Sequence, residues 1–523
     1  MTSSNLIPDS SSRPSAHPTD EHFDVVVVGG GNAALCAAIS AAESGASVVV
    51  LERAPRAERG GNSAFTAGAM RVAYDDVQDV LDIVEELSPE QIRETDFGTY
   101  TQEQFLDDLG RVTEYRTDPD LAEIIVNDSY ATLLWMKKHG IRFAPIYGRQ
   151  AFKVDGRFTF WGGLTIETIG GGQGLVDGLT AECERLGITI RYGCRATSLV
   201  RDGDRVCGVN YRSEGKVSEI SCGAAVMAAG GFQANSAMRA QYLGPGWDLA
   251  KVRGTRFNTG DGIRMAMDVG AAPWGHWSGC HAVGWEYSAP PFGDLRIGDS
   301  FQKHSYPFSI MLNADGKRFL DEGADFRNYT YAKYGKRILE QPGQFAWQIF
   351  DGSLLHLLRD EYRIREVTKI TANTIEQLVT KLEGVDSEQA LRTINDFNAA
   401  IDTEQPFNPN VKDGRRTTTL EVDKTNWAVG LHEPPFHAYR VTCGITFTFG
   451  GLHIGPDASV LDEDTQAIPG LFACGELVGG IFYFNYPGGS GLTAGAVFGR
   501  RSGRAAAQAA LTARSGASDV LTA

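Results

Sequence analysis

The stretch DVVVVGGGNAA occupies residues 24–34, and a second apolar run, SVVVL, follows at residues 47–51. This order predicts a strand, a sharp glycine turn, a helix and a second strand, which is the arrangement that holds the pyrophosphate of a dinucleotide. Gly29 permits the turn, Gly31 lets the backbone approach phosphate oxygens, and the small Ala34 lets the helix pack closely on the strand. The segment therefore predicts an α/β nucleotide-binding fold.

An acidic residue stands where this motif requires one. Glu52 ends the second strand about 20 residues beyond the glycines, and its carboxylate can accept hydrogen bonds from both hydroxyls of the adenosine ribose. The same charge would repel a 2′-phosphate. A glycine turn in an ordinary α/β protein is the alternative, but the two valine-rich strands and the correctly spaced acid favour a dinucleotide.

The composition excludes several classes of protein. At 523 residues the chain is too long for one compact core, so we expect two domains. No apolar run approaches the roughly 18 residues that a membrane span needs, and a net charge of -16 without basic clusters argues against nucleic acid as a partner. Eight cysteines without CxxC or metal-ligand spacing predict free thiols, no metal site and a cytoplasmic location.

Two different kinds of sequence alternate along the chain. Residues 1–21 are rich in Ser, Pro and Asp and are predicted to form a disordered tail. Strong strand-and-helix signals occupy residues 22–275 and 441–515, whereas residues 276–440 carry more aromatic side chains. We predict a Rossmann-like domain built from the two outer segments, with the middle segment inserted as an α+β capping domain that covers a small-molecule substrate.

Several elements repeat the pattern of an apolar strand followed by glycine. They are VVVVGGG at 25–31, AAVMAAGG at 224–231 and LFACGE at 471–476. A nicotinamide enzyme needs one such element, whereas this chain returns to its cofactor more than once. The pattern resembles the flavoprotein subunit superfamily of fumarate reductase and succinate dehydrogenase, over nearly the whole chain after the tail. The resemblance implies FAD.

The same resemblance implies which residues hold FAD. The first motif would hold the ADP part, the GGNS segment at 60–63 would lie against the flavin, and Glu476 would meet the ribityl chain. Members of that superfamily that attach FAD covalently use a histidine in the GG segment, and GGNSAFTAG at 60–68 has none, which implies non-covalent FAD. The predicted cofactor residues are Gly29, Gly31, Asn32, Ala33, Ala34, Glu52, Arg53, Gly60, Gly61, Asn62, Ser63, Gly68, Ala196, Gly230, Gly231, Gly475, Glu476, Ser490, Gly491 and Leu492.

Two narrower resemblances imply different substrates. RGGNS, DEGADFRNYTYAKYG and FNYPGGSGLTAGAVFGR look like the FAD-dependent tricarballylate dehydrogenase group. The Tyr-Pro-Gly turn at 486–488 is similar to that of the 3-ketosteroid dehydrogenase group. Dicarboxylate reductases place an arginine and a histidine where this chain has Tyr486 and Phe447, which argues against fumarate reduction.

Four residues are predicted to act on the substrate. Tyr486, with a backbone N–H near Ser490, would polarise a carbonyl as an oxyanion site. Arg327 falls within one residue of the proton-donor arginine of the reductases, so Tyr329 remains a second candidate for that place, as does Phe326. His281 lies near a histidine that the reductases use for carboxylate binding. The alternatives are an ion pair for Arg327 and a core position for His281.

These residues predict removal of two hydrogens from adjacent carbons beside a carbonyl or carboxylate. A base would take the α-proton and flavin N5 would accept the β-hydrogen as hydride, which would make an α,β-unsaturated product from a small keto acid or cyclic ketone. One alternative is tricarballylate oxidation to cis-aconitate, with electrons passed to a separate acceptor. Another is a non-catalytic FAD subunit for electron transfer. Reaction direction and oligomeric state stay open.

Overall fold

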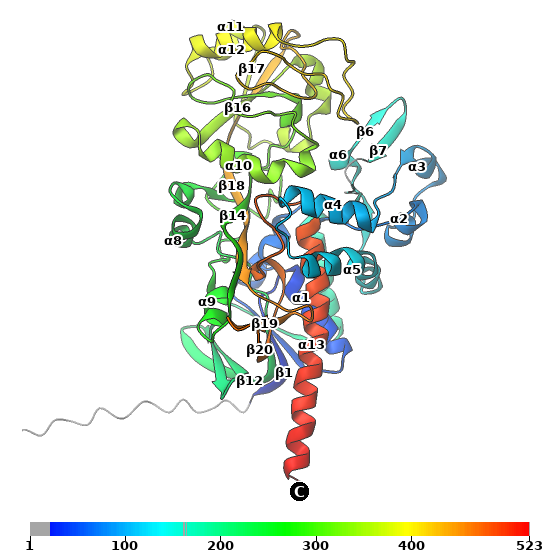
Figure 1. Cartoon of the computed structure of the whole chain (residues 1–523), viewed down its shortest axis with the longest axis vertical. Coiled ribbons are helices and arrows are strands. Elements are labelled where there is room, and N and C mark those ends of the chain that lie inside the picture. The colour runs from blue at the N-terminus through cyan, green and yellow to red at the C-terminus, as the bar shows by residue number, and fades with distance from the viewer. Residues whose placement is uncertain (1–20, 161–162, 164, 522–523) are drawn as a thin grey trace, which may run out of the picture.

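The computed structural model describes residues 21–160, 163 and 165–521, so residues 1–20 of the predicted tail lie outside the described part. Figure 1 shows an elongated molecule with a large sheet and the long C-terminal helix in the lower part, and a smaller sheet with short helices in the upper part. This architecture confirms the predicted fold class, a Rossmann-like α/β fold with an inserted α+β part.

Within the described residues, an eight-stranded sheet forms the lower part, in the order β10-β11-β12-β1-β2-β9, with β20 beside β12 and β19 beside β20. The valines of β1 and β2 are buried, because strands that are covered on both faces need apolar side chains on both. The strands span His22–Val28 (β1), Val48–Glu52 (β2), Thr189–Tyr192 (β9), Arg195–Asp202 (β10), Arg205–Ser213 (β11), Lys216–Met227 (β12), Ser459–Leu461 (β19) and Ala467–Ala473 (β20).

Helix α13 (Ser490–Leu521) lies against α1 (Asn32–Glu43), because glycines recur every four residues along its first turns. A Cβ added to Gly503 would lie 2.1 Å from the carbonyl oxygen of Ala37, so the two backbones touch. This contact brings the N-termini of the two helices together. In Figure 1, α13 runs from the middle of the molecule down past the large sheet to the C-terminus.

A second sheet occupies the upper part and reaches down into the lower one. Its long strands β14 and β18 pair antiparallel from Pro273 opposite Leu452 to Glu286 opposite Val441. The predicted boundaries at 275/276 and 440/441 fall inside these two strands, and the division into domains stays a prediction. The sheet contains Lys251–Val252 (β13), Pro273–Glu286 (β14), Ile310–Leu312 (β15), Phe345–Phe350 (β16), Lys369–Ala372 (β17) and Phe436–Leu452 (β18).

Short helices surround the two sheets. Asp76, Ser88, Thr101 and Asp118 cap the helices that follow them, each through a side chain that accepts backbone N–H groups. The helices are α2 (Val77–Ile83), α3 (Pro89–Arg93), α4 (Gln102–Val112), α5 (Pro119–Lys138), α6 (Tyr147–Gln150), α7 (Gly171–Arg185), α8 (Ser236–Met238), α9 (Asp261–Met267), α10 (Tyr331–Leu339), α11 (Ile375–Val379) and α12 (Ser387–Ala399). Two three-stranded sheets complete the fold and contain β3 (Ala69–Met70), β4 (Thr95–Asp96), β5 (Phe143–Pro145), β6 (Ala151–Val154), β7 (Arg157–Phe160) and β8 (Ile166–Thr168).

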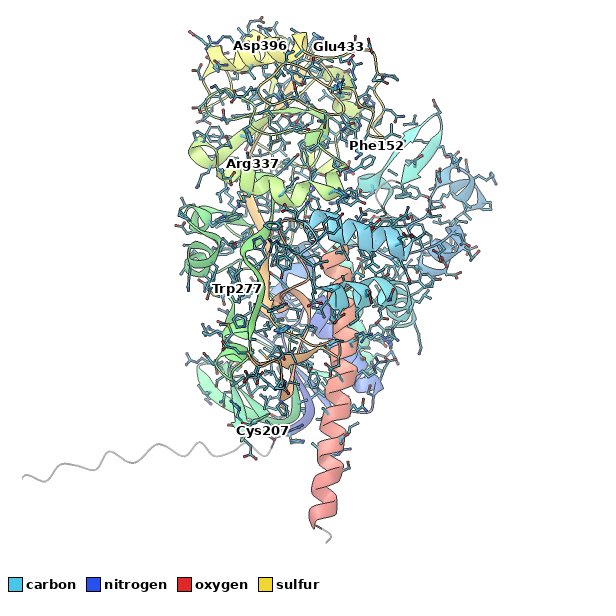
Figure 2. All side chains as sticks on the ribbon, in the orientation of Figure 1. Phe152, Cys207, Trp277, Arg337, Asp396 and Glu433 are labelled. Atoms are coloured by element: carbon cyan, nitrogen blue, oxygen red, sulfur yellow. The ribbon has the colours of Figure 1, made fainter. Side chains whose placement is uncertain are left out.

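All eight cysteines are free thiols; seven are buried, and Cys207 is half-buried at the lower end of the molecule (Figure 2). In the described ranges no helix combines the length and the apolar character of a membrane span.

Candidate active site

Two adjoining cavities open where the carboxyl ends of β1 and β20 meet the N-termini of α1 and α13. We call them the nucleotide cavity, lined by the glycine turn and Glu52, and the aromatic cavity, lined by Tyr331, Phe447, Phe449, Phe482 and Tyr486. They share the lining residues Asn32, Ala33, Asn62, Ser63, Gly475 and Glu476. One elongated space therefore runs from the glycine turn to the aromatic side chains, as a dinucleotide requires.

The glycine turn has the geometry that the sequence predicts. Gly29 has a φ of +117°, and a Cβ there would lie 2.3 Å from the carbonyl oxygen of Ala228, so only glycine fits. At Gly31, the N-cap of α1, a Cβ would make only ordinary contacts with its protein neighbours, at 3.5 Å. Gly31 has no side chain to cap the helix, and apart from the Asn32 N–H, which donates to the Ser63 hydroxyl, the first N–H groups of α1 stay available to an anion.

Two buried carboxylates mark the ends of the nucleotide cavity. The Glu52 carboxylate accepts a hydrogen bond from the Ala54 N–H at 2.6 Å; burial raises the pKa of Glu52, although backbone N–H groups lower it in part. Burial raises the pKa of Glu476 to about 7, against the donors Thr448 N–H, Gln233 and Asn258. Protonated or paired acceptors of this kind suit the hydroxyls of a ribose and a ribityl chain.

Asn32, Asn62 and Ser63 join the segments between the cavities. The Ser63 hydroxyl accepts the Asn32 N–H at 3.1 Å, and the Asn32 amide donates to the Leu492 carbonyl at 2.9 Å. Asn62 donates to the Thr446 carbonyl at 2.5 Å. The residues thus hold the first helix, the GGNS segment, α13 and β18 around one space, which fits the predicted FAD.

The predicted cofactor residues fall into two groups. Those that line a cavity are Gly29, Gly31, Asn32, Ala33, Glu52, Arg53, Gly61, Asn62, Ser63, Ala196, Gly230, Gly475, Glu476, Gly491 and Leu492. Those that line neither cavity are Ala34, Gly60, Gly68, Gly231 and Ser490. The second group packs behind the lining: a Cβ at Gly68 would lie 2.1 Å from Thr168, and one at Gly231 would lie 2.3 Å from Thr448.

Arg53 is engaged with protein partners as well as lining the nucleotide cavity. Its guanidinium pairs with Asp261 at 3.0 Å, and Arg195 binds the same carboxylate at 2.8 Å. The two arginines therefore share one acid at the wall of the nucleotide cavity.

Tyr486 lies in the aromatic cavity against a second tyrosine. Its hydroxyl contacts the hydroxyl of Tyr331, the first residue of α10. Burial raises the pKa of both phenols; Arg253, the hydrogen bond from Tyr486 and Arg327 act in the opposite direction on Tyr331. A pair of phenols in a water-poor cavity can donate a hydrogen bond and hold a proton at the same place.

His281, on β14, packs against both phenols. Its ring lies 4.7 Å from that of Tyr486 and 4.9 Å from that of Tyr331, and the side chain is buried. Burial and the nearby Arg253 lower the pKa of His281 well below its usual value, so the ring is neutral. Among the described residues, neither ring nitrogen has a hydrogen-bond partner. Its polar edges are therefore available to a ligand.

Three arginines form part of the wall of the aromatic cavity; Arg253 and Arg327 are buried, and Arg149 is half-buried. Asp299 binds two of them, Arg253 through Nε at 2.8 Å and Arg149 at 2.8 Å. The Arg327 guanidinium forms hydrogen bonds with His304 Nδ1 and the Arg149 carbonyl, both at 3.3 Å, and lies 5.4 Å from the centre of the Tyr331 ring; its Nε has no hydrogen-bond partner in the described part of the chain. Arg327 is 8% exposed and pairs with no described carboxylate. The wall carries more positive than negative charge, which suits an anionic ligand.

Tyr329 points elsewhere. Its hydroxyl donates to Asp108 at 2.5 Å, and the side chain does not line the aromatic cavity. The 3-10 turn at Arg327–Tyr329 leads into α10, so residues 329 and 331 point in different directions.

Sequence reasoning missed Tyr331 as a named site residue, together with Arg149, Arg253 and Asp299. Tyr331 belongs to the same cap segment as Arg327, and its signal was the tyrosine run NYTYAKY. The three charged residues lie in segments far apart in the sequence and carry no local motif. In the described segments, no group of His, Cys, Asp and Glu side chains has the arrangement of a metal site.

Comparison with known proteins agrees with the cavity geometry. The family model described as FAD binding domain matches residues 24–492. A probable fumarate reductase of Shewanella frigidimarina is 29% identical, over 94% of this chain and 76% of that protein. The 4-oxocyclohexanecarboxylate 2-dehydrogenase of Sinomonas cyclohexanicum is 30% identical, over 90% of both.

A solved structure supports the fold. The 3-ketosteroid Δ1-dehydrogenase of Sterolibacterium denitrificans matches with a TM-score of 0.71 and 21% identity, over 93% of this chain and 100% of that one. The predicted resemblance to fumarate reductases, with ketosteroid dehydrogenases as neighbours, is therefore confirmed, and so is FAD as the cofactor. The chain belongs to the FAD binding domain family and is an FAD-dependent oxidoreductase acting on CH–CH groups.

Proposed function

We propose that the protein is a dehydrogenase that forms a C=C bond α,β to a carbonyl in a small keto acid, with a cyclic ketone acid as the leading substrate class. One observation carries the proposal: the aromatic cavity contains both a phenol pair, Tyr486 and Tyr331, and a buried arginine, Arg327, that pairs with no described carboxylate. A ketone matches the first feature and a carboxylate matches the second.

The protein side of the reaction follows from these contacts. Tyr486 donates a hydrogen bond to the ketone oxygen, which makes the α-carbon acidic. Tyr331 acts as the base in its phenolate form, which burial disfavours and the charges of Arg253 and Arg327 favour, and it becomes a neutral phenol when it takes the α-proton. When bound, FAD supplies the acceptor for the β-hydrogen and its two electrons. The substrate loses H⁺ and hydride, and an enone remains.

Arg327 distinguishes a keto acid from a neutral steroid. A buried guanidinium without a carboxylate partner costs stability, and an anionic substrate group would remove that cost in the complex. His281 offers a further polar edge beside the phenols. The relative from Sinomonas cyclohexanicum carries a name that refers to a substrate with both groups, which supports the same class here.

The other substrate and partner hypotheses are less well supported. Tricarballylate would need several cationic or polar carboxylate ligands, whereas Tyr486 and Phe447 present a phenol and a hydrocarbon ring to the cavity. An electron-transfer subunit would have no use for a neutral His281 and a phenol pair at the end of the cofactor space. We infer non-covalent FAD and a separate electron acceptor.

Anaerobic titration of the FAD-loaded protein tests the proposal. The loss of oxidised-flavin absorbance would be followed with 4-oxocyclohexanecarboxylate, its methyl ester, tricarballylate and a 3-ketosteroid. We expect the keto acid to bleach the flavin most readily and the ester to require a higher concentration. Bleaching by tricarballylate with all three ketones inert would overturn the proposal, and so would bleaching by the steroid alone.

A further inference from the structure

Arg71 is a fully buried arginine that takes no direct part in either cavity. It follows β3, is 0% exposed, and its Nε donates to the Gly488 carbonyl at 2.8 Å while Nη1 donates to the Tyr100 hydroxyl at 2.7 Å. Its backbone N–H donates to the Gly489 carbonyl at 3.3 Å. One residue therefore holds both carbonyl groups of the Gly488–Gly489 pair, directly after Tyr486 and Pro487 in the chain.

The contact between Arg71 and the Gly488 carbonyl also fixes the direction of the Gly489 N–H. In a trans peptide the N–H points opposite to the C=O of the same unit, so fixing the Gly488 carbonyl on Arg71 sends the Gly489 N–H the other way. That side is the aromatic cavity, which Gly489 lines. The pKa of Tyr486 reflects the same orientation, because burial and Tyr331 raise it whereas the Gly489 N–H lowers it.

The neighbouring amide does not compete for this role. The Ser490 N–H donates back to the Pro487 carbonyl at 3.2 Å, within the turn. Gly489 has a φ of +85°, which lets the chain turn from Tyr486 into α13 without strain. The Gly489 N–H is therefore the backbone donor that faces the Tyr486 hydroxyl.

We propose that Arg71 is a positioning residue: it holds the Gly488–Gly489 carbonyls so that the Gly489 N–H and the Tyr486 hydroxyl converge on the ketone oxygen of the substrate. This inference rests on the proposed function for the identity of that oxygen. The hold on the turn itself depends only on the contacts of Arg71.

A second set of contacts keeps the guanidinium charged and oriented. Burial alone would lower the pKa of Arg71, but Tyr100, Tyr329 and Asp108 raise it. Asp108 accepts the Tyr100 hydroxyl at 2.6 Å and the Tyr329 hydroxyl at 2.5 Å, and lies 3.6 Å from Arg71 Nη1. Tyr329, predicted as a catalytic residue, thus belongs to the set that orients Arg71.

Lysine could keep the charge but not the geometry. The planar guanidinium places separate donors on Gly488 and Tyr100, whereas an ammonium group is a single point on a flexible stem. Arg71→Lys therefore separates positioning from mere charge. Arg501→Lys is the matched control, since Arg501 lies on α13, binds Asp128 at 2.9 Å and is remote from the turn.

Amide hydrogen exchange of the FAD-loaded protein without substrate is the first measurement. We expect Arg71→Lys to raise the exchange rate of the backbone amides in residues 485–493 by about tenfold or more, whereas Arg501→Lys leaves them at the wild-type rate. Should Arg71→Lys fail to fold, Tyr100→Phe, which removes one partner of Nη1, is expected to change the same amides in the same direction. Wild-type exchange in both variants would overturn the inference.

Single-turnover flavin reduction by 4-oxocyclohexanecarboxylate is the second measurement. We expect Arg71→Lys to slow reduction at saturating keto acid by about 10- to 100-fold, with little change in the half-saturating concentration. Combined with Tyr486→Phe it is expected to add little, because both changes damage one donor pair. Fully additive losses would overturn the inference. If the wild type is not reduced by any keto acid, the proposed function fails, and hydrogen exchange alone still decides whether Arg71 holds the turn.

Discussion

At the scale of single residues, the phenol of Tyr486 is the group on which the chemistry depends. Tyr486→Phe removes the hydroxyl and keeps the ring that packs against His281 and Phe447. We expect flavin reduction by the keto acid to slow by about 100-fold or more, as for the loss of one oxyanion donor. Tyr483→Phe, a half-buried tyrosine nearby in sequence, is the control. Wild-type rates for Tyr486→Phe would remove the hydroxyl from the mechanism.

Arg327, also at the scale of single residues, should affect binding of the substrate carboxylate and not the rate of flavin reduction. Arg327→Met should weaken binding of 4-oxocyclohexanecarboxylate by about 10- to 100-fold, the range for one hydrogen bond to a charged group. Binding of the methyl ester should change little. Arg337→Met is the matched control, because Arg337 (labelled in Figure 2) is an exposed residue of α10 whose guanidinium, among the described residues, pairs only with the exposed Glu340. Equal losses for acid and ester would show that Arg327 does not recognise the carboxylate.

Glu476 adds a pH dependence that has a definite sign. Its folded pKa of about 7 lies above the ordinary 4.5, so the folded FAD-free protein keeps a proton that the unfolded chain has lost between these values. The contribution of Glu476 to the free energy of unfolding is therefore fully present below pH 4.5. It is lost as the pH rises to 7, and the loss is on the order of 3 kcal/mol. Glu476→Gln should remove this loss.

Thermal midpoints of the FAD-free protein between pH 4.5 and 8 measure the effect. The thermal midpoint of Glu476→Gln is expected to rise relative to that of the wild type as the pH rises to 7. Above pH 7 the difference between the two midpoints should stay constant. Glu463→Gln, at an exposed position, gives the background. Parallel curves for wild type and Glu476→Gln would contradict the raised pKa.

At the scale of elements, two glycines of the turn between β1 and α1 have different tasks: Gly29 is needed for folding and Gly31 for cofactor binding. Gly31→Ala adds a methyl group that has only ordinary protein contacts at 3.5 Å, so the FAD-free protein should melt near the wild type. The same methyl group occupies the space where phosphate oxygens would approach, so FAD affinity should fall by about tenfold or more. Gly29→Ala, with its Cβ 2.3 Å from a carbonyl oxygen, should destabilise the FAD-free protein itself. Normal FAD affinity in Gly31→Ala would contradict this assignment.

The elements that the sequence predicts well are those with local signals. The glycines of the turn at Gly29–Gly31 and of the start of α13 stand out in the sequence, although Ala228 and Arg71, which contact these turns, lie far away in the chain. The wall of Arg149, Arg253 and Asp299 has no such signal, because folding alone joins three distant segments. The sequence also does not show which cap tyrosine faces the cavity, because the switch from a 3-10 turn to α10 decides the directions of Tyr329 and Tyr331.

At the scale of the whole molecule, there are separate hydrophobic cores, and the apolar cavity lining, with Tyr331 and Tyr486, belongs to one of them. One hydrophobic cluster fills the large sheet and continues along β14 and β18, whereas another, with Trp347, Leu378 and Phe397, fills the upper end around α11 and α12. The upper core is remote from the cavity lining, so it gains little from a bound cofactor. The two parts should therefore respond differently to FAD.

Calorimetry with and without FAD tests this difference. At an FAD concentration of 100 times its dissociation constant, the part that contains the cavities should gain about 2.7 kcal/mol, and its transition should move to a higher temperature. Phe397→Ala, which empties a fully buried position on α12, should lower the free energy of unfolding of the upper core by about 3–5 kcal/mol. It should leave FAD affinity unchanged. If Phe397→Ala and FAD instead shifted one common transition, the molecule would unfold as a single cooperative unit, and β14 and β18 would be the elements that couple its two cores.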